Sequence, residues 1–136
     1  MSPFIRPIHS AALSEYKRGL LYGDGFFETM KIERGVISYW YLHWFRILQT
    51  ADFLNISLNF TQEALQESIL DFIKPYVKQD VLRVRLNFIR QSDGYYSPGD
   101  PQSVGVIGEV TDLPHDYTSP QKKGLIVDLS SVLKPI

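Results

Sequence analysis

The feature that most constrains the fold is a regular alternation of apolar and polar side chains in residues 81–90, VLRVRLNFIR. In an extended chain, neighbouring side chains point to opposite faces, so this pattern predicts a strand with one buried face. The apolar face would carry Leu82, Val84, Leu86 and Phe88, and the polar face Arg83, Arg85 and Asn87. Such a strand belongs to a sheet whose apolar face must be covered by other elements of the chain.

A β-hairpin is predicted for residues 26–38, in which 33–35 (Glu-Arg-Gly) make the turn between a long strand and a short return strand. The stretch RGLLYGDGFFETM, residues 18–30, is predicted to be a tight turn that feeds this hairpin. Glycines on both sides of Asp24 permit positive φ angles and a close approach of the backbone. Residues 1–16 are expected to be irregular.

Two helices are predicted between the hairpin and the alternating strand. The first begins near Trp40 and ends at Asn55. The second follows Thr61, a good N-cap residue, and ends near Pro75 because proline disfavours continuation. Each has a core-facing apolar stripe at helical spacing. The stripe residues are Trp44, Ile47, Ala51 and Leu54 in the first helix, and Leu65, Ile69, Phe72 and Tyr76 in the second.

Two more strands are predicted after the alternating one, at residues 103–111 and from Leu125 to about Val132. The order ββααβββ predicts an α+β domain, with an antiparallel sheet that carries two helices packed on one side. At 136 residues, with 44% hydrophobic and 21% charged side chains, the chain is expected to form a single domain spanning residues 1–136.

Charge and composition narrow the classes of function. The net charge is −1 and the basic residues are scattered, so we expect no nucleic-acid binding. The absence of cysteine excludes disulfides and thiolate metal sites, and three dispersed histidines give a metal site little support. No apolar run approaches the roughly 18 residues of a membrane span, and the N-terminus lacks the apolar segment of a secretory signal. We therefore expect a cytoplasmic protein without membrane contact.

Arg46 is the first candidate binding residue. It lies beside the apolar stripe of the first predicted helix, and two interpretations fit it: a solvated or ion-paired edge residue, or a group that captures an anion. The second follows from the guanidinium, whose N–H groups fork onto a phosphate or a carboxylate. His43, one turn earlier, either orients this arginine, contacts a ligand or is structural.

Three further arginines and a tyrosine are candidates. Arg83 and Arg85 share one strand face, where like charges repel unless an anion or a carboxylate lies nearby. That face is either plain solvent-exposed surface or the floor of a cleft for an anionic substrate. Arg90 opens the following loop and would serve the same cleft. Tyr95 in that loop belongs either to a simple connection or to the rim of a pocket.

Three stretches of the chain, taken in order, resemble one family. They are RGLLYGDGFFETM, HWFRILQTADFL and LRVRLNFIRQSDGYYSP. They are similar to the N-terminal domain of class IV aminotransferases, the fold-type IV pyridoxal-phosphate enzymes, which include branched-chain and D-amino-acid aminotransferases and 4-amino-4-deoxychorismate lyase. The most specific part is the H-x-x-R pair of His43 and Arg46, which follows the Phe-Glu-Thr of residues 27–29. The resemblance extends from Tyr16 to Pro135.

The resemblance implies roles for several of these residues. Arg46 would bind the phosphate of pyridoxal 5'-phosphate, and Tyr22 and Phe27 would line the substrate pocket. Glu28 and Thr29 would belong to the strand under that pocket, in a supporting role. Arginines near Arg83, Arg85 and Arg90 meet substrate carboxylates in some members of the family.

The resemblance also implies partners and a substrate class. The substrate would be a small amino acid or an amino-chorismate, and the protein would be a homodimer. The motif GDGFFET is more similar to the lyase and D-amino-acid branches than to the branched-chain branch. The cofactor would carry the chemistry, by holding the charge left when the Cα proton is removed.

One part of the family's pattern is missing from this chain. The lysine that carries the cofactor lies in the second domain of the family, and SSVLKPI resembles the segment shortly before it. Lys134 therefore matches a linker position and is not assigned that role. We expect a chain that lacks the C-terminal catalytic-lysine domain, has no catalytic residue of its own and is inactive alone. Whether it binds the cofactor stably is left open.

Two alternatives remain from the sequence. The first is a stand-alone dimerisation domain that keeps the fold without the chemistry. The second is a small anion-binding module that uses Arg46 together with the face of Arg83 and Arg85.

Overall fold

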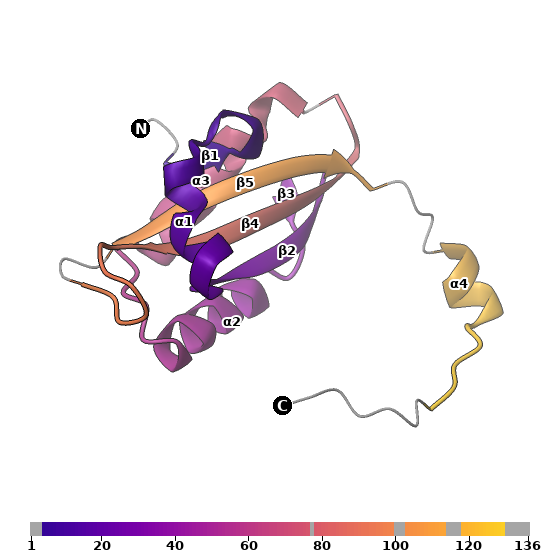
Figure 1. Cartoon of the computed structure of the whole chain (residues 1–136). Coiled ribbons are helices and arrows are strands. Elements are labelled where there is room, and N and C mark those ends of the chain that lie inside the picture. Colours follow the sequence, from indigo (N-terminus) through magenta and orange to yellow (C-terminus); the bar gives the residue numbers. More distant parts are fainter. Residues whose placement is uncertain (1–3, 77, 100–102, 114–117, 130–136) are drawn as a thin grey trace.

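The computed structural model describes residues 4–76, 78–99, 103–113 and 118–129. Their main feature is a five-stranded sheet in the order β1-β5-β4-β2-β3 (Figure 1). The strands are Arg6–Pro7 (β1), Gly25–Glu33 (β2), Val36–Ile37 (β3), Val81–Gln91 (β4) and Ser103–Asp112 (β5). Neighbouring strands are antiparallel except β1 and β5, which run parallel. The predicted α+β fold with an antiparallel sheet is confirmed, with this one short parallel pair added.

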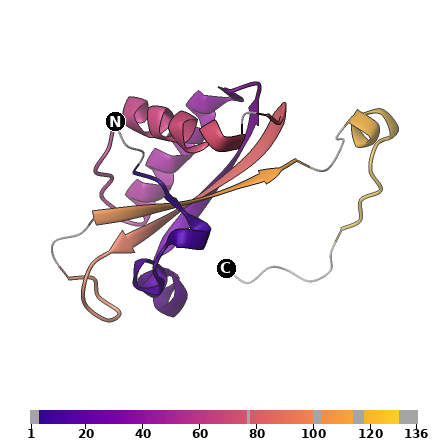
Figure 2. The same cartoon turned by 90° about the horizontal axis from the view of Figure 1, so that it is seen from above.

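Two helices cover one face of the sheet, as predicted. They are α2 (Trp40–Phe53) and α3 (Gln62–Phe72), and Figure 2 shows both on the same side of the strands. The alternation in β4 decides which face they cover, because the side chains from Leu82 to Phe88 that point toward the helices are almost fully buried. Ile47 of α2 and Ile69 of α3 meet them in the core.

The predicted helix boundaries agree with the structure. Thr61 precedes α3, and its side-chain oxygen accepts a hydrogen bond of 3.2 Å from the N–H of Ala64, as an N-cap does. Asn55 follows α2 in the left-handed region, with φ at 52°. Pro75 lies in a short 3-10 turn, Lys74–Tyr76, just after α3 has ended.

The prediction of a tight turn for residues 18–30 was wrong in its first part. Leu13–Tyr22 form a helix, α1, which lies on the opposite face of the sheet from α2 and α3 (Figure 2). The turn begins only at Gly23, which ends the helix in the left-handed region with φ at 62°. The expectation of irregular structure for 1–16 was also wrong where it can be compared, because β1 and the start of α1 lie there. Residues 1–3 of that range lie outside the described residues.

Gly19 in the middle of α1 made a helix unexpected from the sequence, but packing explains why a glycine is there. A Cβ on Gly19 would lie 3.4 Å from the side chain of Ile89, so the missing side chain lets α1 rest close to β4. Gly25 also allows a close approach, because a Cβ there would lie 2.5 Å from the carbonyl oxygen of Phe88. Glycine usually weakens helices, and here tertiary packing overrides that preference.

The predicted last strand is also corrected. The described residues after β5 contain a short helix, α4 (Thr118–Lys123), and residues 125–129 form no strand. The side chains of Leu125, Val127 and Leu129 are exposed, so their alternation has no sheet to meet. Residues 130–132 of that prediction lie outside the described residues.

Candidate functional site

Several predicted site residues lie at or beside one edge of β2. Along its whole length β2 pairs with β4, but only its last two residues pair with β3. Within the described part of the chain, residues 25–30 therefore have no strand on their other side. Successive side chains of a strand point to opposite faces, so Phe27 and Glu28 enter different surroundings at this edge.

Glu28 is a buried acid on the face of β2 that α2 covers. Its side chain is 7% exposed. Nδ1 of His43 donates to Oε1 of Glu28 over 2.5 Å, and Nη2 of Arg46 donates to the same oxygen. An ionised carboxylate has no hydrogen to give, so the imidazole hydrogen on this side belongs to Nδ1. We call these three residues the Glu28 cluster.

The Glu28 cluster depends on helical spacing and on the register of β2. His43 and Arg46 are three residues apart, so α2 presents both on one side. Glu28 occupies a buried position between the inward-facing residues of β2, and its Oε1 accepts from two donors of the helix. The cluster therefore ties the edge strand to α2 through charge-assisted hydrogen bonds.

Arg46 is held at one end only. Its side chain is 61% exposed although Nη2 is bound to Glu28. Nε and Nη1 have no hydrogen-bond partner among the described residues. A guanidinium that is fixed by one nitrogen and open at the others can receive an oxyanion.

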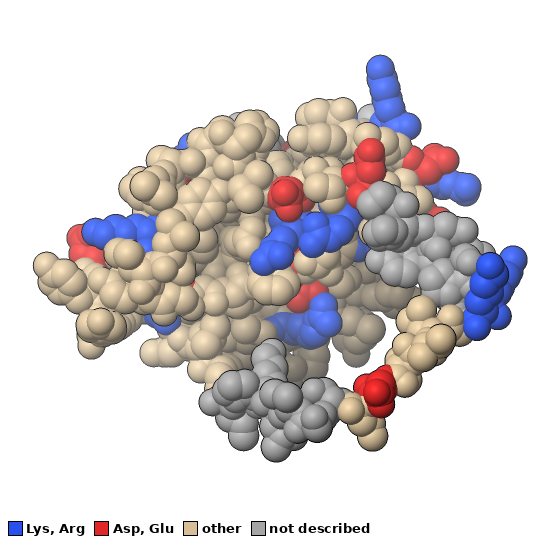
Figure 3. Space-filling model, turned by 45° about the vertical axis from the view of Figure 1, so that its right-hand side comes forward, with Lys and Arg blue, Asp and Glu red and all other residues tan. Residues whose placement is uncertain are grey.

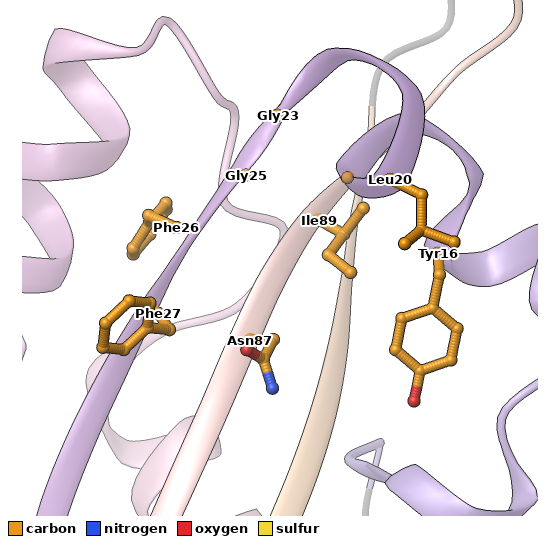
Figure 4. Close-up of a pocket in the computed structure, with 9 residues that line it drawn as sticks. Tyr16, Leu20, Gly23, Gly25, Phe26, Phe27, Asn87 and Ile89 are labelled. Atoms are coloured by element: carbon orange, nitrogen blue, oxygen red, sulfur yellow. The ribbon is translucent and has the colours of Figure 1, made fainter.

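Phe27, on the other face, borders a pocket between α1 and β4. The pocket has a cavity volume of about 250 Å³. In Figure 4, Tyr16 and Leu20 reach into it from α1, Asn87 and Ile89 from β4, and Phe27 lies on β2 at the far side. The lining is mostly apolar, with the amide of Asn87 and the hydroxyl of Tyr16 as polar groups, as in many small-molecule sites.

Arg85 lies over the ring of Phe27, with its guanidinium carbon 3.8 Å from the ring centroid. Its Nε donates to the side-chain oxygen of Asn87 over 3.3 Å. Arg83 has a carboxylate partner instead, with Nη1 3.9 Å from Glu109. The two like charges of this strand face are thus each compensated, one by an aromatic ring and one by an acid.

Arg90 belongs to a separate cluster centred on Asp24. Its Nε donates to both carboxylate oxygens of Asp24, over 3.0 and 3.2 Å. Its Nη1 and Nη2 donate to the carbonyls of Asn55 and Leu54 over 2.7 and 2.8 Å. Nε of Arg18 donates to Oδ2 of Asp24 over 2.6 Å. We call Arg18, Asp24 and Arg90 the Asp24 cluster.

The Asp24 cluster is nearly enclosed by protein. The side chains of Arg18, Arg90 and Asp24 are 5%, 7% and 15% exposed. Burial raises the pKa of Asp24, but hydrogen bonds from Arg90 and Arg18 and their positive charges together bring this pKa below its usual value. Asp24 is therefore held in its ionised form.

The loop after β4 is tied to the Asp24 cluster. Nη1 of Arg18 donates to the carbonyls of Gly94 and Tyr95, each over 3.1 Å. The side chain of Tyr95 itself is exposed. Tyr22 ends α1 with its ring 5.4 Å from that of Tyr96. Tyr22 lines a second pocket of about 500 Å³ together with Arg18 and Arg90, and does not border the pocket of Phe27.

The structure brings some predicted site residues together and separates others. Phe27 and Arg85 are in contact. Arg46 and Tyr22 lie on helices that cover opposite faces of the sheet (Figure 2), so they do not enclose one hollow in this chain. The ligand-binding roles of these residues remain predictions.

The sequence did not reveal which residues are the hydrogen-bond partners of Glu28 and Asp24. It gave Glu28 a supporting role without naming Arg46 or His43 as its partners, and it did not consider Arg18. The available signals were the alternation of β2, which places Glu28 inward, and the i, i+3 spacing of His43 and Arg46. For the contact of Asp24 with Arg90 no local signal exists, because the two residues are 66 positions apart.

Other kinds of site find no support in the described part of the chain. It holds no group of three or more His, Cys, Asp or Glu residues that could bind a metal ion. None of its helices is long and apolar enough to cross a membrane. On the face that Figure 3 shows, basic side chains are interspersed with acidic ones rather than gathered in one patch.

Residues 25–134 match the family model described as amino-transferase class IV. The chain belongs to this family. The family is pyridoxal-phosphate-dependent, and its enzymes act on amino acids or aminodeoxychorismate. A comparison with curated proteins found no match.

Three solved structures have a similar fold. They are a putative 4-amino-4-deoxychorismate lyase from Legionella pneumophila (19% identity, TM-score 0.60), 4-amino-4-deoxychorismate lyase from Pseudomonas aeruginosa (25%, 0.58) and a fold IV-transaminase from Curtobacterium pusillum (22%, 0.56). The matches cover 82%, 74% and 76% of this chain, but only 42%, 35% and 34% of those chains. The class IV chain described here thus spans less than half the length of these proteins. Its α+β fold is that of the N-terminal region of fold-type IV enzymes.

The residues of the Glu28 cluster fit the phosphate of the family's cofactor. The fit rests on the donors of Arg46, an exposed guanidinium that is hydrogen-bonded through Nη2 to the buried Glu28 and has other N–H groups without a partner among the described residues. A phosphate dianion needs strong donors of positive charge, and this arrangement supplies them at the surface of the chain.

Proposed function

We propose that this chain is the N-terminal domain of a pyridoxal-phosphate-dependent class IV aminotransferase or 4-amino-4-deoxychorismate lyase, and that Arg46 binds the cofactor phosphate. One observation carries the proposal: Arg46 is fixed by Glu28 at one nitrogen and exposed at the others. Such a guanidinium matches a phosphate in charge and in hydrogen-bond geometry. Membership of the class IV family supports the same assignment.

On the substrate side we assign Phe27 and Arg85 first. The ring of Phe27 and the guanidinium above it stand beside the mostly apolar pocket between α1 and β4. They would present an apolar surface and a positive charge to an amino acid or an amino-chorismate, whose carboxylate needs a cationic partner.

Four other predicted pocket residues receive weaker roles. Tyr22, Arg83 and Tyr95 remain candidates for substrate contact. Arg90 is proposed to act through the position of Asp24 and the end of α2, because its Nε, Nη1 and Nη2 already donate to protein oxygens.

The cofactor, when bound, supplies the electron sink for the charge left at Cα. This chain would bind and orient: Arg46 would hold the phosphate on the α2 face of β2, and Phe27 and Arg85 would limit where the substrate lies on the other face. The two ligands would then meet across the edge of β2 that is unpaired in the described part of the chain. The relatives are more than twice as long as the matched segment, so we propose that the lysine for proton transfer comes from a part of the protein outside residues 1–136. We also propose a homodimer, since α1 carries exposed leucines at positions 13, 20 and 21. The cytoplasmic location proposed for it rests on the sequence alone, which holds no cysteine.

The test is binding of pyridoxal 5'-phosphate to the chain and to the variant Arg46→Gln, followed by the ³¹P resonance of the ligand. We expect binding to weaken at least tenfold, the order of effect of losing a charge-assisted hydrogen bond. Pyridoxal, which has no phosphate and is followed by its absorbance instead, should bind weakly and equally to both proteins.

Arg6→Gln is the matched control. Arg6 is 63% exposed and is also paired with an acid, since its Nε lies 3.0 Å from Glu15. Loss of a surface charge alone would weaken binding in both variants, whereas a specific site responds only to the change at Arg46. Equal affinity of the chain and Arg46→Gln for pyridoxal 5'-phosphate would contradict the proposal.

A small anion-binding module is the second candidate, because an exposed arginine such as Arg46 can bind an anion that carries no pyridine ring. It would bind inorganic phosphate as tightly as pyridoxal 5'-phosphate. A cofactor site would prefer the cofactor, since the pyridine ring adds contacts that phosphate alone cannot make. Competition between the two ligands therefore separates the candidates.

A further inference from the structure

We propose that Glu28 is a positioning residue that sets the orientation of Arg46 for binding a phosphate group. The inference rests on the proposed function and adds a second residue to it. Glu28 is a buried acid whose charge would repel an anion, so it would contribute to an anion site only through its effect on Arg46.

The contacts of Glu28 favour this role. Its Oε1 accepts from Nη2 of Arg46 and from Nδ1 of His43, so one oxygen receives two donors from the same helix. His43 is itself only 14% exposed, so its contact with this oxygen is largely shielded from solvent. The two donors restrict the position of this oxygen, and the bond to it in turn restricts where the guanidinium of Arg46 can lie.

Exposure explains why Arg46 needs such a residue. A long side chain at the surface samples many rotamers, and binding an anion would have to freeze them. An anchor at one hydrogen of Nη2 restricts these rotamers before the ligand arrives and leaves the other N–H groups of the guanidinium for the phosphate. Arg46 is otherwise mostly solvent-exposed, so Glu28 is the group that orders it.

Charge alone predicts the opposite effect of Glu28. A negative charge next to the guanidinium repels an incoming phosphate, so removing that charge should strengthen binding. Positioning predicts that removing the charge-assisted hydrogen bond weakens binding. The two explanations differ in sign and can be separated by a single variant.

The experiment measures the affinity of inorganic phosphate and of pyridoxal 5'-phosphate for the chain, Glu28→Gln and Glu28→Asp. Glutamine keeps the reach and removes the charge, while aspartate keeps the charge and shortens the reach by one methylene. We expect both variants to bind roughly three- to tenfold more weakly, as for part of one charge-assisted hydrogen bond. Tighter binding by Glu28→Gln with unchanged binding by Glu28→Asp would overturn the proposal in favour of a pure charge effect.

A second readout needs no ligand. The NMR line shapes of the Nη hydrogens report rotation of each guanidinium, and we expect slow rotation for Arg46 in the unmodified chain and fast rotation in Glu28→Gln. Arg6 is the internal reference, and its rotation should be the same in both proteins. If Arg46 rotates as freely as Arg6 in the unmodified chain, Glu28 does not position it.

The two readouts separate this proposal from the proposed function. Slow rotation of Arg46 combined with phosphate affinity that is unaffected by Arg46→Gln would refute the phosphate site and leave the orienting effect of Glu28 in place. Loss of affinity in Arg46→Gln combined with unchanged affinity in both Glu28 variants would keep the site and refute positioning. Circular dichroism spectra and thermal midpoints of all variants check that the fold is retained.

Discussion

Two carboxylate–arginine clusters lie close in sequence and differ in almost every physical respect. In the Asp24 cluster the acid lies between two arginines that are 5% and 7% exposed and whose N–H groups donate to protein oxygens. In the Glu28 cluster the acid is the buried member and the arginine is 61% exposed. The arginines of the Asp24 cluster therefore use their N–H groups within the fold, whereas Arg46 of the Glu28 cluster keeps N–H groups that a ligand could reach.

The comparison shows that an arginine's role depends on where its remaining N–H groups point. Arg90 joins β4, the α1–β2 turn and the end of α2 through Asp24 and the carbonyls of Leu54 and Asn55. Arg46 joins only α2 to β2. Burying charges is costly unless they are fully paired, so the buried cluster must be complete, whereas the exposed arginine tolerates open positions.

The largest effect is expected for Arg90→Met. Methionine fills part of the space but leaves Asp24 with one arginine fewer and two carbonyls without their donor. We expect the free energy of unfolding to fall by roughly 3–5 kcal/mol, as when one partner of a buried ion pair is removed. Urea unfolding followed by tryptophan fluorescence measures it. A fall of less than about 1 kcal/mol in the free energy of unfolding, which is the value for exposed ion pairs, would mean that the buried Asp24 cluster is no more stabilising than an exposed one.

The next largest effect is expected in how the free energy of unfolding depends on pH. The pKa of Asp24 is lower in the folded chain than its ordinary value of about 3.9 in an unfolded one. The stability it contributes is therefore complete above that ordinary value and is lost as the pH falls through the lower folded pKa. The urea midpoint should drop between pH 4 and pH 2 in the unmodified chain and drop less in Asp24→Asn. Identical pH profiles of the two proteins would show that Asp24 is not the group responsible.

The smallest effect on stability is expected for Arg46→Gln. Because Arg46 is mostly exposed and His43 remains bonded to Glu28, we expect the free energy of unfolding to change by no more than about 1 kcal/mol. The same urea titration measures this change. A loss as large as that of Arg90→Met would mean that the Glu28 cluster is mainly structural, and would weaken its assignment to a cofactor phosphate.

Much of the fold could be predicted because its signals are local. The alternation in residues 81–90 places Leu82, Leu86 and their neighbours inward, and Thr61 and Asn55 act as predicted at the ends of helices. The helix α1 could not be predicted from its glycines, because the space that Gly19 provides is needed only against Ile89, a residue 70 positions away in sequence. The strand predicted at Leu125 failed because alternation is only a local signal: residues 125–129 pair with no strand in the described part of the chain.

By itself the sequence determined the strand and helix pattern, the class IV family and the arginines that are candidates for an anion. Only the tertiary structure decided among those arginines, by burying Arg90 against Asp24 and leaving Arg46 open behind Glu28. The physical reason is that helix and strand periodicity act over a few residues, whereas burial and hydrogen-bond partners are set by residues that meet across the sheet.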